Sequence, residues 1–559
     1  MEREECLSIL ADVLQQFSPS GSADQAEDCL SRLGYVVTLT ANVESTRDFL
    51  GLSVSIWSKL SEAIGAFVDN LAPDLKEDAL SILRVRIVRG VVLTARNLVV
   101  GVKNALKSED KHKTTNGFNL NTRELYSLII QNQKHVNALA MFSLDNLEHA
   151  KLQGPEDLKI PIVELYMKTI AACFQYLTNL STADIEDIHD VAHHLDLKGV
   201  SPLLHRVVMF DGDMGKMPAN SHINVFGSSE VIIPFSIYVN NISNNPCIIQ
   251  ELFDNPMAAG LLKHFIDKYD VSDRQTLEAF SEVDYLNMSI SFKVVTHEGF
   301  LAFSKQLVQQ NDEEAHQVMF QLLKLVQLLT ASKEWDWDSN KLTIVITWLL
   351  EIYRSLSREA TPLLSAEGLT VAEKETLSKN QKSLLCALDT IGSLCQYDHV
   401  RNYLNSYKFL EELIAFLHIV HNNTERKTLK SSTDSVSAGK KEYPMIKSVI
   451  IEIITFLIYQ NFENQELVRN LHALEVVLSN CNLDKNEPFV KERAILCIKY
   501  LLENNPGNQE FVRKMEAQRT VIDKEDEAIL ERTGFEVDIV DGNVRLKRSD
   551  KLQELERKN

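Results

Sequence analysis

Three histidines and four carboxylates lie within a short stretch of the chain and together have the composition of a metal site. His189, His193 and His194 stand close to the acidic residues Asp184, Glu186, Asp187 and Asp190. On a helix, His189 and His193 would share a face, and two imidazoles one turn apart can ligate zinc. Zinc proteases with this spacing also need a glutamate directly after the first histidine, whereas Asp190 follows His189. The pattern is more typical of a solvated helix end, and we predict no metal site there.

A second motif, Asp211-Gly-Asp-Met-Gly-Lys216, superficially resembles a calcium-binding or phosphate-binding loop. An EF-hand needs ligands at loop positions 1, 3, 5 and 12, and Gly215 occupies the fifth position. A P-loop needs Ser or Thr after its lysine, and Met217 follows Lys216. We therefore interpret this segment as a surface loop.

The acidic aromatic motif Trp335-Asp-Trp-Asp338 could accept a basic segment of a partner, but such tryptophans more often pack between neighbouring helices. Armadillo import adaptors grip basic peptides with Trp and Asn four residues apart. The residues four positions after the four tryptophans of this chain are Ser61, Ser339, Lys341 and Ile352. This difference disfavours an import adaptor.

The eight cysteines contain no CxxC pair, and the closest two, Cys386 and Cys395, are nine residues apart. This is neither a disulfide framework nor zinc-knuckle spacing. We interpret the cysteines as reduced core thiols in a cytosolic compartment, and we predict no cofactor.

The charge balance also excludes several classes of protein. The chain of 559 residues has 58 basic and 78 acidic residues, a net charge of −20, which argues against nucleic-acid binding and anionic membranes. The first residues, Met1 to Glu5, are too acidic for a targeting peptide, and the longest apolar stretch, 449–459, is too short to span a bilayer. We expect a cytoplasmic protein without membrane insertion.

The elements that must position any binding residue are helices. Apolar residues recur at helical spacing from the first segment onward, as in Cys6, Ile9, Leu10, Val13, Leu14 and Phe17. The segment 446–458 is apolar nearly all round, as an inner helix of a stack would be. Gly (20) and Pro (13) are scarce, which is unlike a β-sandwich or a disordered chain.

One sequence repeat indicates how the helices are arranged. Asn464-Gln-Glu-Leu-Val-Arg469 returns 44 residues later as Asn508-Gln-Glu-Phe-Val-Arg513. A period of about 40–47 residues is typical of HEAT and armadillo units. We predict an all-α fold, a right-handed armadillo/HEAT-like α-solenoid, with Asn464 and Asn508 as helix N-caps.

A third, degenerate copy indicates an insertion. His399-Val-Arg-Asn402 resembles Leu467-Val-Arg-Asn470 with an offset of 68 between the valines, which exceeds the period by 24 residues. The polar segment 421–443 nearly accounts for this excess. We predict that it is a disordered insertion because none of its residues can be buried in a core. It carries the candidate phosphorylation sites Ser431, Ser432, Thr433, Ser435 and Ser437.

The resulting domain prediction has six parts. It comprises an N-terminal helical armadillo-like region (1–210), a loop (211–230), middle helical repeats (231–420), the insertion (421–443), C-terminal repeats (444–520), and a capping helix with a hairpin tail (521–559). In the tail, alternating apolar residues flank Asp541-Gly542, which predicts a short β-hairpin. A charged helix over 515–533 would cap the last repeat.

The C-terminal repeats resemble the ataxin-10 family. The run from Asn486 to Gln509 is similar to that family's signature of Asn-x-Pro-Phe, an aliphatic residue, a basic residue and Glu, then Ala-Ile and Leu-x-Glu-x-Asn-x-x-Asn-Gln. The resemblance is specific over 445–515 and suggests a fungal member. Arg493 stands where the family often has Trp, and Lys499-Tyr500 where it often has Arg-Asn.

The resemblance implies an armadillo-like solenoid without enzymatic activity, similar to cytoplasmic scaffolds linked to cytokinesis and cell survival. It also implies protein partners, signalling or cell-division factors, and candidate protein-binding residues at Glu492, Arg493, Lys499 and Glu503. The sequence neither favours nor excludes a homo-oligomer. The leading hypothesis is thus a non-enzymatic helical scaffold. The alternatives are a transport or import adaptor and an enzyme with an unrecognised site.

Overall fold

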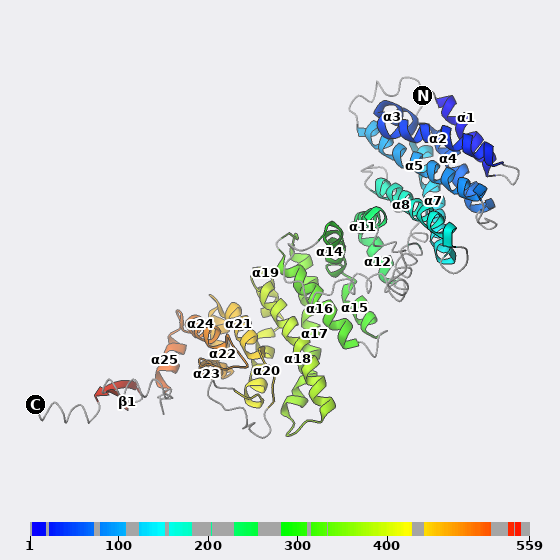
Figure 1. Cartoon of the computed structure of the whole chain (residues 1–559). Coiled ribbons are helices and arrows are strands. Elements are labelled where there is room, and N and C mark those ends of the chain that lie inside the picture. Colours follow the sequence, from blue (N-terminus) through cyan, green and yellow to red (C-terminus); the bar gives the residue numbers. More distant parts are fainter. Residues whose placement is uncertain are drawn as a thin grey trace, which may run out of the picture. The chain divides into compact units, whose positions relative to one another are not determined.

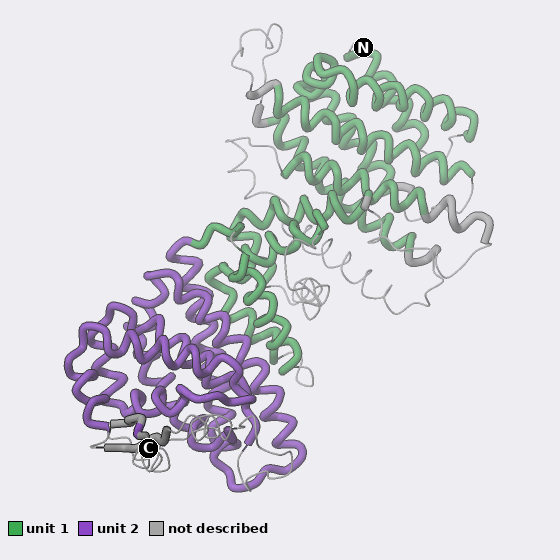
Figure 2. The backbone as a smooth tube through the Cα atoms, turned by 60° about the vertical axis from the view of Figure 1, so that its left-hand side comes forward, with its two compact units in different colours: residues 1–337 green, residues 338–559 purple. Residues whose placement is uncertain are grey.

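The computed structural model describes most of the chain's helices. The described residues are 3–17, 22–71, 79–107, 122–150, 156–181, 203, 229–254, 281–309, 315–332, 334–426, 441–515, 535–540 and 543–548. They form two compact units, Met1–Trp337 and Asp338–Asn559 (Figure 2). The described structure is helical apart from one two-stranded hairpin and an isolated β-bridge, which confirms the predicted all-α class.

The helices of the first unit follow one another along the chain as antiparallel and stacked elements (Figure 1). They are α1 (Arg3–Gln16), α2 (Ala23–Asn42), α3 (Glu44–Gly51), α4 (Val54–Ala66), the π-helix η1 (Phe67–Leu71), α5 (Ala79–Lys107), α7 (Thr122–Ala150), α8 (Glu156–Ser181), α11 (Ser229–Ile242), α12 (Pro246–Asp254), α14 (Glu282–Val295), α15 (Phe300–Gln309) and α16 (Ala315–Ala331).

These helices pack in two rows. In one row, α2, α5, α8, α11 and α14 each contact the next, and in the other row α1 contacts α4 and α4 contacts α7. Large side chains fill the space between helices, among them Trp57, Phe67, Phe174 and Tyr176, all fully buried. Capping boxes fix two helix starts, where Ser22 and Ser281 each exchange hydrogen bonds with the residue three positions later.

The second unit contains shorter helices and the hairpin. Its elements are α17 (Ser339–Ser365), α18 (Val371–Leu394), α19 (Asp398–Ser406), α20 (Phe409–Asn423), α21 (Ile446–Ile458), α22 (Phe462–Asn470), α23 (Ala473–Ser479), α24 (Val490–Leu502), α25 (Pro506–Lys514), β1 (Phe535–Val540) and β2 (Asn543–Arg548).

Within this unit the chain repeats a pattern of three helices. A nine-residue helix, a second helix and a 13-residue helix occur as α19, α20 and α21 and again as α22, α23 and α24, and the nine-residue α25 starts a third set. The helices α22 and α25 begin 44 residues apart, as do α21 and α24. The predicted period is confirmed, and the three-helix unit is that of an armadillo repeat.

The predicted register of the third copy is wrong by one helical turn. The helices α19 and α22 begin 64 residues apart, and the left-handed residues before the second helices, Lys408 and His472, have the same offset. The predicted offset of 68 pairs Val400 with Val468, whereas the structure pairs Leu404 with Val468. Residues four apart lie on the same helix face, so the apolar residues align nearly as well at the predicted offset as at the observed one.

The predicted N-caps are also displaced. The caps of α22 and α25 are Asn461 and Asn505, and each side chain accepts a hydrogen bond from the backbone N–H of Asn464 or Asn508. The sequence favoured Asn464 and Asn508 as caps because they are the first residues of the repeated Asn-Gln-Glu motif. Their side chains are instead buried inside the stack.

The insertion predicted at 421–443 is shorter than expected. Residues 421–423 belong to α20, Thr424 forms a β-bridge with Lys441, and Tyr443 is buried. The prediction that no residue of this segment is buried was therefore wrong at both ends, at Thr424 and at Tyr443. Residues 427–440, including the five candidate phosphorylation sites, lie outside the described residues.

The predicted hairpin is confirmed. Strands β1 and β2 pair antiparallel, with Phe535 opposite Arg548 and Val540 opposite Asn543. The predicted capping helix lies outside the described residues except for Met515.

Most cysteines are free and buried as predicted, but Cys247 is exposed and Cys481 is half-buried. Burial raises the pKa of the Cys6 thiol to about 12, which makes it unreactive. Among the helices that the structure describes, none is both long and apolar enough to cross a bilayer.

Candidate protein-binding surface

The four candidate protein-binding residues lie on or directly after α24, but they do not share one environment. Glu492, Lys499 and Glu503 are seven and eleven residues apart, which places them on one face of the helix, and all three are exposed. Arg493 is turned away from this face by about 100°, the rotation per residue of an α-helix. The opposite face, with Val490, Ala494, Cys497 and Leu501, is buried.

Arg493 is engaged between two helices. Its Nη2 lies 2.6 Å from Glu452 Oε2 on α21, and its Nη1 donates a hydrogen bond to Ser448 Oγ (3.0 Å). Burial raises the pKa of the Glu452 carboxyl, and the Arg493 guanidinium opposes this shift. Arg493 therefore joins α24 to α21, in a position where the family often has tryptophan.

The exposed face of α24 is equivalent to a buried face of α21. Shifted by the 44-residue period, Ser448, Ile451 and Thr455 correspond to Glu492, Ile495 and Lys499. Ile451 is 0% exposed because α24 packs beside α21, whereas Ile495 is 51% exposed. This difference identifies a repeat face that is exposed among the residues that the structure describes. We call Glu492, Ile495, Leu496, Lys499 and Glu503 the α24 stripe.

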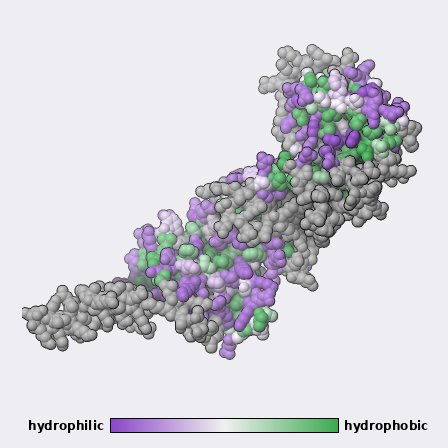
Figure 3. All heavy atoms as spheres, viewed as in Figure 1, coloured by the Kyte–Doolittle hydropathy of each residue, from purple (hydrophilic) through white to green (hydrophobic). Residues whose placement is uncertain are grey.

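Aromatic residues border the stripe. The ring of Tyr500 meets that of Tyr459 edge to face, with centroids 5.0 Å apart, and Lys499 Nζ lies 5.4 Å from the centroid of the Tyr500 ring. Phe489, just before α24, is also exposed. On the face seen in Figure 3, hydrophobic residues of this unit lie in small groups among hydrophilic ones. The stripe thus offers apolar area flanked by charges of both signs.

A buried ionic cluster fixes where α24 begins. Lys447 Nζ lies 3.2 Å from Asp484 Oδ2, with both side chains at most 5% exposed. Glu487 accepts hydrogen bonds from the backbone N–H groups of Lys447 (3.1 Å) and Ser448 (3.0 Å) at the start of α21. Burial raises the pKa of Glu487 to about 7, although the Lys447 ammonium acts in the opposite direction. The loop before α24 is thereby attached to α21.

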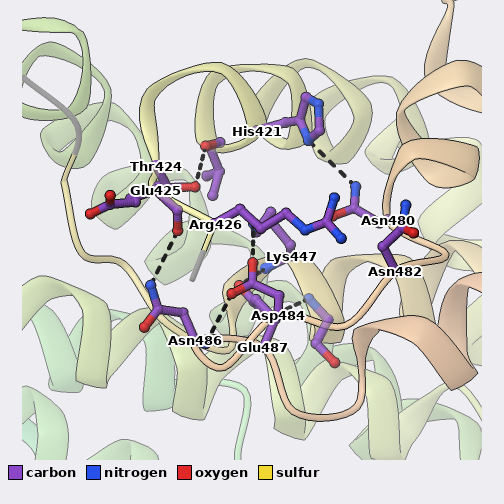
Figure 4. A network of polar contacts seen from close by, with 12 residues as sticks. His421, Thr424, Glu425, Arg426, Lys447, Asn480, Asn482, Asp484, Asn486 and Glu487 are labelled. Atoms are coloured by element: carbon purple, nitrogen blue, oxygen red, sulfur yellow. Dashed lines mark hydrogen bonds and ion pairs between the residues drawn. The ribbon is translucent and has the colours of Figure 1, made fainter. Parts of the chain in front are cut away.

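The same loop holds the chain that leaves α20. Asn486 Nδ2 donates to the carbonyl oxygen of Glu425 (3.1 Å), and Arg426 Nε donates to that of Leu483 (3.3 Å). Figure 4 shows residues 424–426 running beside this loop, with Lys447, Asp484 and Glu487 beneath. This cluster could not be predicted from the sequence, in which its one signal is that Lys447 interrupts an apolar helix.

The other motifs singled out from the sequence do not add a chemical site. In the part of the chain that the structure describes, no group of three or more His, Cys, Asp or Glu side chains could hold a metal. His189, His193, His194 and the segment 211–216 lie outside that part. Trp335 stacks on Tyr285 and Phe292, which both belong to α14, so the predicted packing between neighbouring helices is confirmed for this one helix only.

Taken together, stacked three-helix repeats with an uncovered helical face define an armadillo-like helical-repeat protein. Comparison with known proteins narrows this class. The family model described as the spinocerebellar ataxia type 10 protein domain matches residues 446–547, which include the whole α24 stripe. The ataxin-10 homolog of Debaryomyces hansenii is 30% identical over 538 residues, covering 95% of this chain and 94% of that protein. The chain belongs to the ataxin-10 family.

Other similar proteins are more distant. The ataxin-10 homolog of Saccharomyces cerevisiae is 26% identical and covers 82% of this chain and 81% of that protein. Both named relatives are fungal, in agreement with the predicted fungal member. Among solved structures, importin beta gives a TM-score of 0.28 at 10% identity, covering 88% of this chain and 57% of that chain. A circular tandem repeat protein gives 0.24 at 12% identity, with coverage of 92% and 99%.

Proposed function

We propose that this protein is a non-enzymatic cytoplasmic scaffold that binds other proteins through exposed faces of its helical repeats. The observation that carries the proposal is the α24 stripe, where Ile495 and Leu496 are 51% and 44% exposed inside the region shared with the family. Contiguous exposed apolar residues with a polar rim are typical of surfaces that bind a partner, and the stripe has this arrangement.

The chemistry of the stripe fits a protein segment. Its two aliphatic side chains would contribute buried apolar area, and Glu492, Lys499 and Glu503 would set the register of an amphipathic partner by charge. The resemblance to the family points to signalling or cell-division partners and to roles in cytokinesis and cell survival. A second copy of the chain is the other occupant that the experiment below can detect.

Regulation forms part of this proposal. Phosphates on Ser431, Ser432, Thr433, Ser435 or Ser437 would add negative charge to the segment between Arg426 and Lys441. Both flanks of this segment are hydrogen-bonded to the stack. Arg426 Nε donates to the carbonyl oxygen of Leu483, and Lys441 Nζ donates to that of Leu364 (2.8 Å). A charge change there would act through Arg426 on the loop that positions α24.

The test is crosslinking and affinity capture of the full-length chain from its native cell. The double variant Ile495→Glu/Leu496→Glu keeps the helix but places carboxylates on the stripe. The control is Val371→Glu, since Val371 is also apolar and 85% exposed but starts α18. We expect the double variant to recover at least tenfold less of one or more partners than the unmodified chain does. The control should recover these partners in unchanged amounts. Equal recovery of every partner by both variants would exclude the α24 stripe as a binding surface.

A further inference from the structure

Helix α5 of the first unit has an unusual charge for so acidic a protein. Between Ala79 and Lys107 it carries the six basic residues Arg84, Arg86, Arg89, Arg96, Lys103 and Lys107 and no Asp or Glu. Arg86, Arg89, Leu93 and Arg96 follow one another at helical spacing and are exposed or half-buried, whereas Val85, Val88, Val92 and Ala95 are buried. We call Arg86, Arg89, Leu93 and Arg96 the α5 basic stripe.

The basic stripe forms one wall of a groove. A hollow of about 300 Å³ between α2 and α5 is lined by Leu30, Leu33, Gly34, Val37, Arg86, Arg89, Gly90 and Leu93. The helices approach closely at its floor, where a Cβ on Gly90 would come within 2.7 Å of Leu33 Cδ2. A Cβ on Gly34 would meet nothing within 4 Å, so the groove is open above that residue.

The arginines of the stripe lack carboxylate partners at ion-pair distance within the described part of the chain. Arg96 donates to neutral acceptors, Gln175 Oε1 and Asn97 Oδ1. The Nε of Arg89 is buried and makes no hydrogen bond to any described residue. Glu230, at the start of α11, is the acidic group that acts on Arg89, and it only partly offsets the burial and the Arg86 charge that lower the pKa of Arg89.

We propose that this groove between α2 and α5 binds an acidic, leucine-containing segment of a partner protein. Guanidinium groups pair with carboxylates through two parallel hydrogen bonds, and Arg86 and Arg89 are one helical turn apart on the open side. The aliphatic wall formed by Leu30, Val37 and Leu93 would receive a leucine side chain of the segment. A net charge of −20 and a basic face of only three arginines are unsuited to the many phosphate contacts of nucleic acid.

The site is separate from the α24 stripe, and the proposal does not depend on it. The probe is a fluorescein-labelled decapeptide of glutamate and leucine, two glutamates to each leucine, titrated with the full-length protein by fluorescence anisotropy. We expect saturable binding that weakens as salt rises from 50 to 200 mM, because the contact is ionic. A peptide of the same pattern with glutamine in place of glutamate should bind at least tenfold more weakly.

Two variants test the location of the binding. Arg86→Gln/Arg89→Gln removes the cations, and we expect about tenfold or greater loss of affinity. Gly34→Leu fills the groove without removing a charge and replaces a helical glycine with a better helix former, so the fold is not at risk. It should weaken binding to a similar extent.

The matched control is Arg32→Gln, since Arg32 also lies on α2 but pairs with Asp12 of α1 (2.6 Å). It should leave the affinity unchanged. Unchanged binding by both groove variants would overturn the proposal, as would equally tight binding of the glutamine peptide. Binding of vesicles containing 25% phosphatidylserine without binding of the peptide would also overturn it, in favour of a membrane surface.

Discussion

Asn464 and Asn508 occupy equivalent positions in consecutive repeats and make the same internal contact. Each side-chain amide donates a hydrogen bond to the carbonyl oxygen seven residues earlier, that of Leu457 (2.7 Å) or Leu501 (2.8 Å). Each also reaches the preceding nine-residue helix, Asn464 through Asn405 Oδ1 and Asn508 through the Gln465 carbonyl oxygen. The repeated asparagine therefore joins successive repeats by satisfying carbonyls at the end of the 13-residue helices.

Replacing Asn508 with alanine should loosen the last described repeat. Asn508 is fully buried and also accepts a hydrogen bond from Arg469 (3.0 Å), so its loss would leave buried polar groups unpaired. The expected cost is about 1–3 kcal/mol. Hydrogen exchange should show faster exchange across α24 and α25 in N508A. In the control N482A, an exposed asparagine, exchange should match the unmodified chain, and matching exchange in N508A would refute the structural role.

Lys447→Met should be strongly destabilising, although methionine matches the apolar character of α21. It would leave Asp484 and Glu487 buried without their ammonium partner, which costs about 3–5 kcal/mol for a broken buried ion pair. The full-length variant should melt at lower temperature than Lys382→Met, which removes an exposed lysine of α18. Equal melting temperatures would show that the buried cluster contributes little.

The Glu487 carboxyl should make stability depend on pH. Its pKa is raised from 4.5 to about 7 by burial, so the folded protein holds this proton more tightly than the unfolded chain does. Its contribution to the unfolding free energy is therefore constant below about pH 4.5, declines as pH rises to about 7, and is constant above that. The decline is of the order of 3 kcal/mol.

Glu487→Gln removes this titration. Between pH 5 and 7.5, hydrogen exchange of the α21 amides should accelerate more in the unmodified chain than in E487Q, after correction for intrinsic exchange. Parallel pH profiles in the two proteins would mean that Glu487 does not titrate in this range.

The segment after Lys514 should be needed for stability, because a stack of repeats must cap its last apolar face. We predict that deletion of 515–559 lowers the melting temperature, whereas deletion of 535–559 mainly reduces partner binding. If both truncations melt like the intact chain and keep every crosslinked partner, the segment has neither role.

Sequence reasoning reached the all-α class, the 44-residue period and the hairpin, because these depend on local periodicity and turn residues. It misplaced Val400 by one turn, since helical patterns repeat at nearly the same face every four residues. It missed the hydrogen bond from the Lys447 backbone N–H to the Glu487 carboxylate, because contacts across 40 residues leave no periodic signal. The basic stripe of α5 is visible in the sequence as arginines at helical spacing, although the overall charge of −20 gives no sign of a basic surface.

The most direct test of the scaffold proposal is quantitative crosslinking of the full-length protein in its native cell, comparing I495E/L496E with V371E. Both variants should have helical circular dichroism spectra like that of the unmodified chain. We expect the yield of at least one partner crosslinked to α24 to fall at least tenfold in I495E/L496E and to be unchanged in V371E. Equal yields of every crosslinked partner in the two variants would contradict the proposal that this repeat face binds proteins.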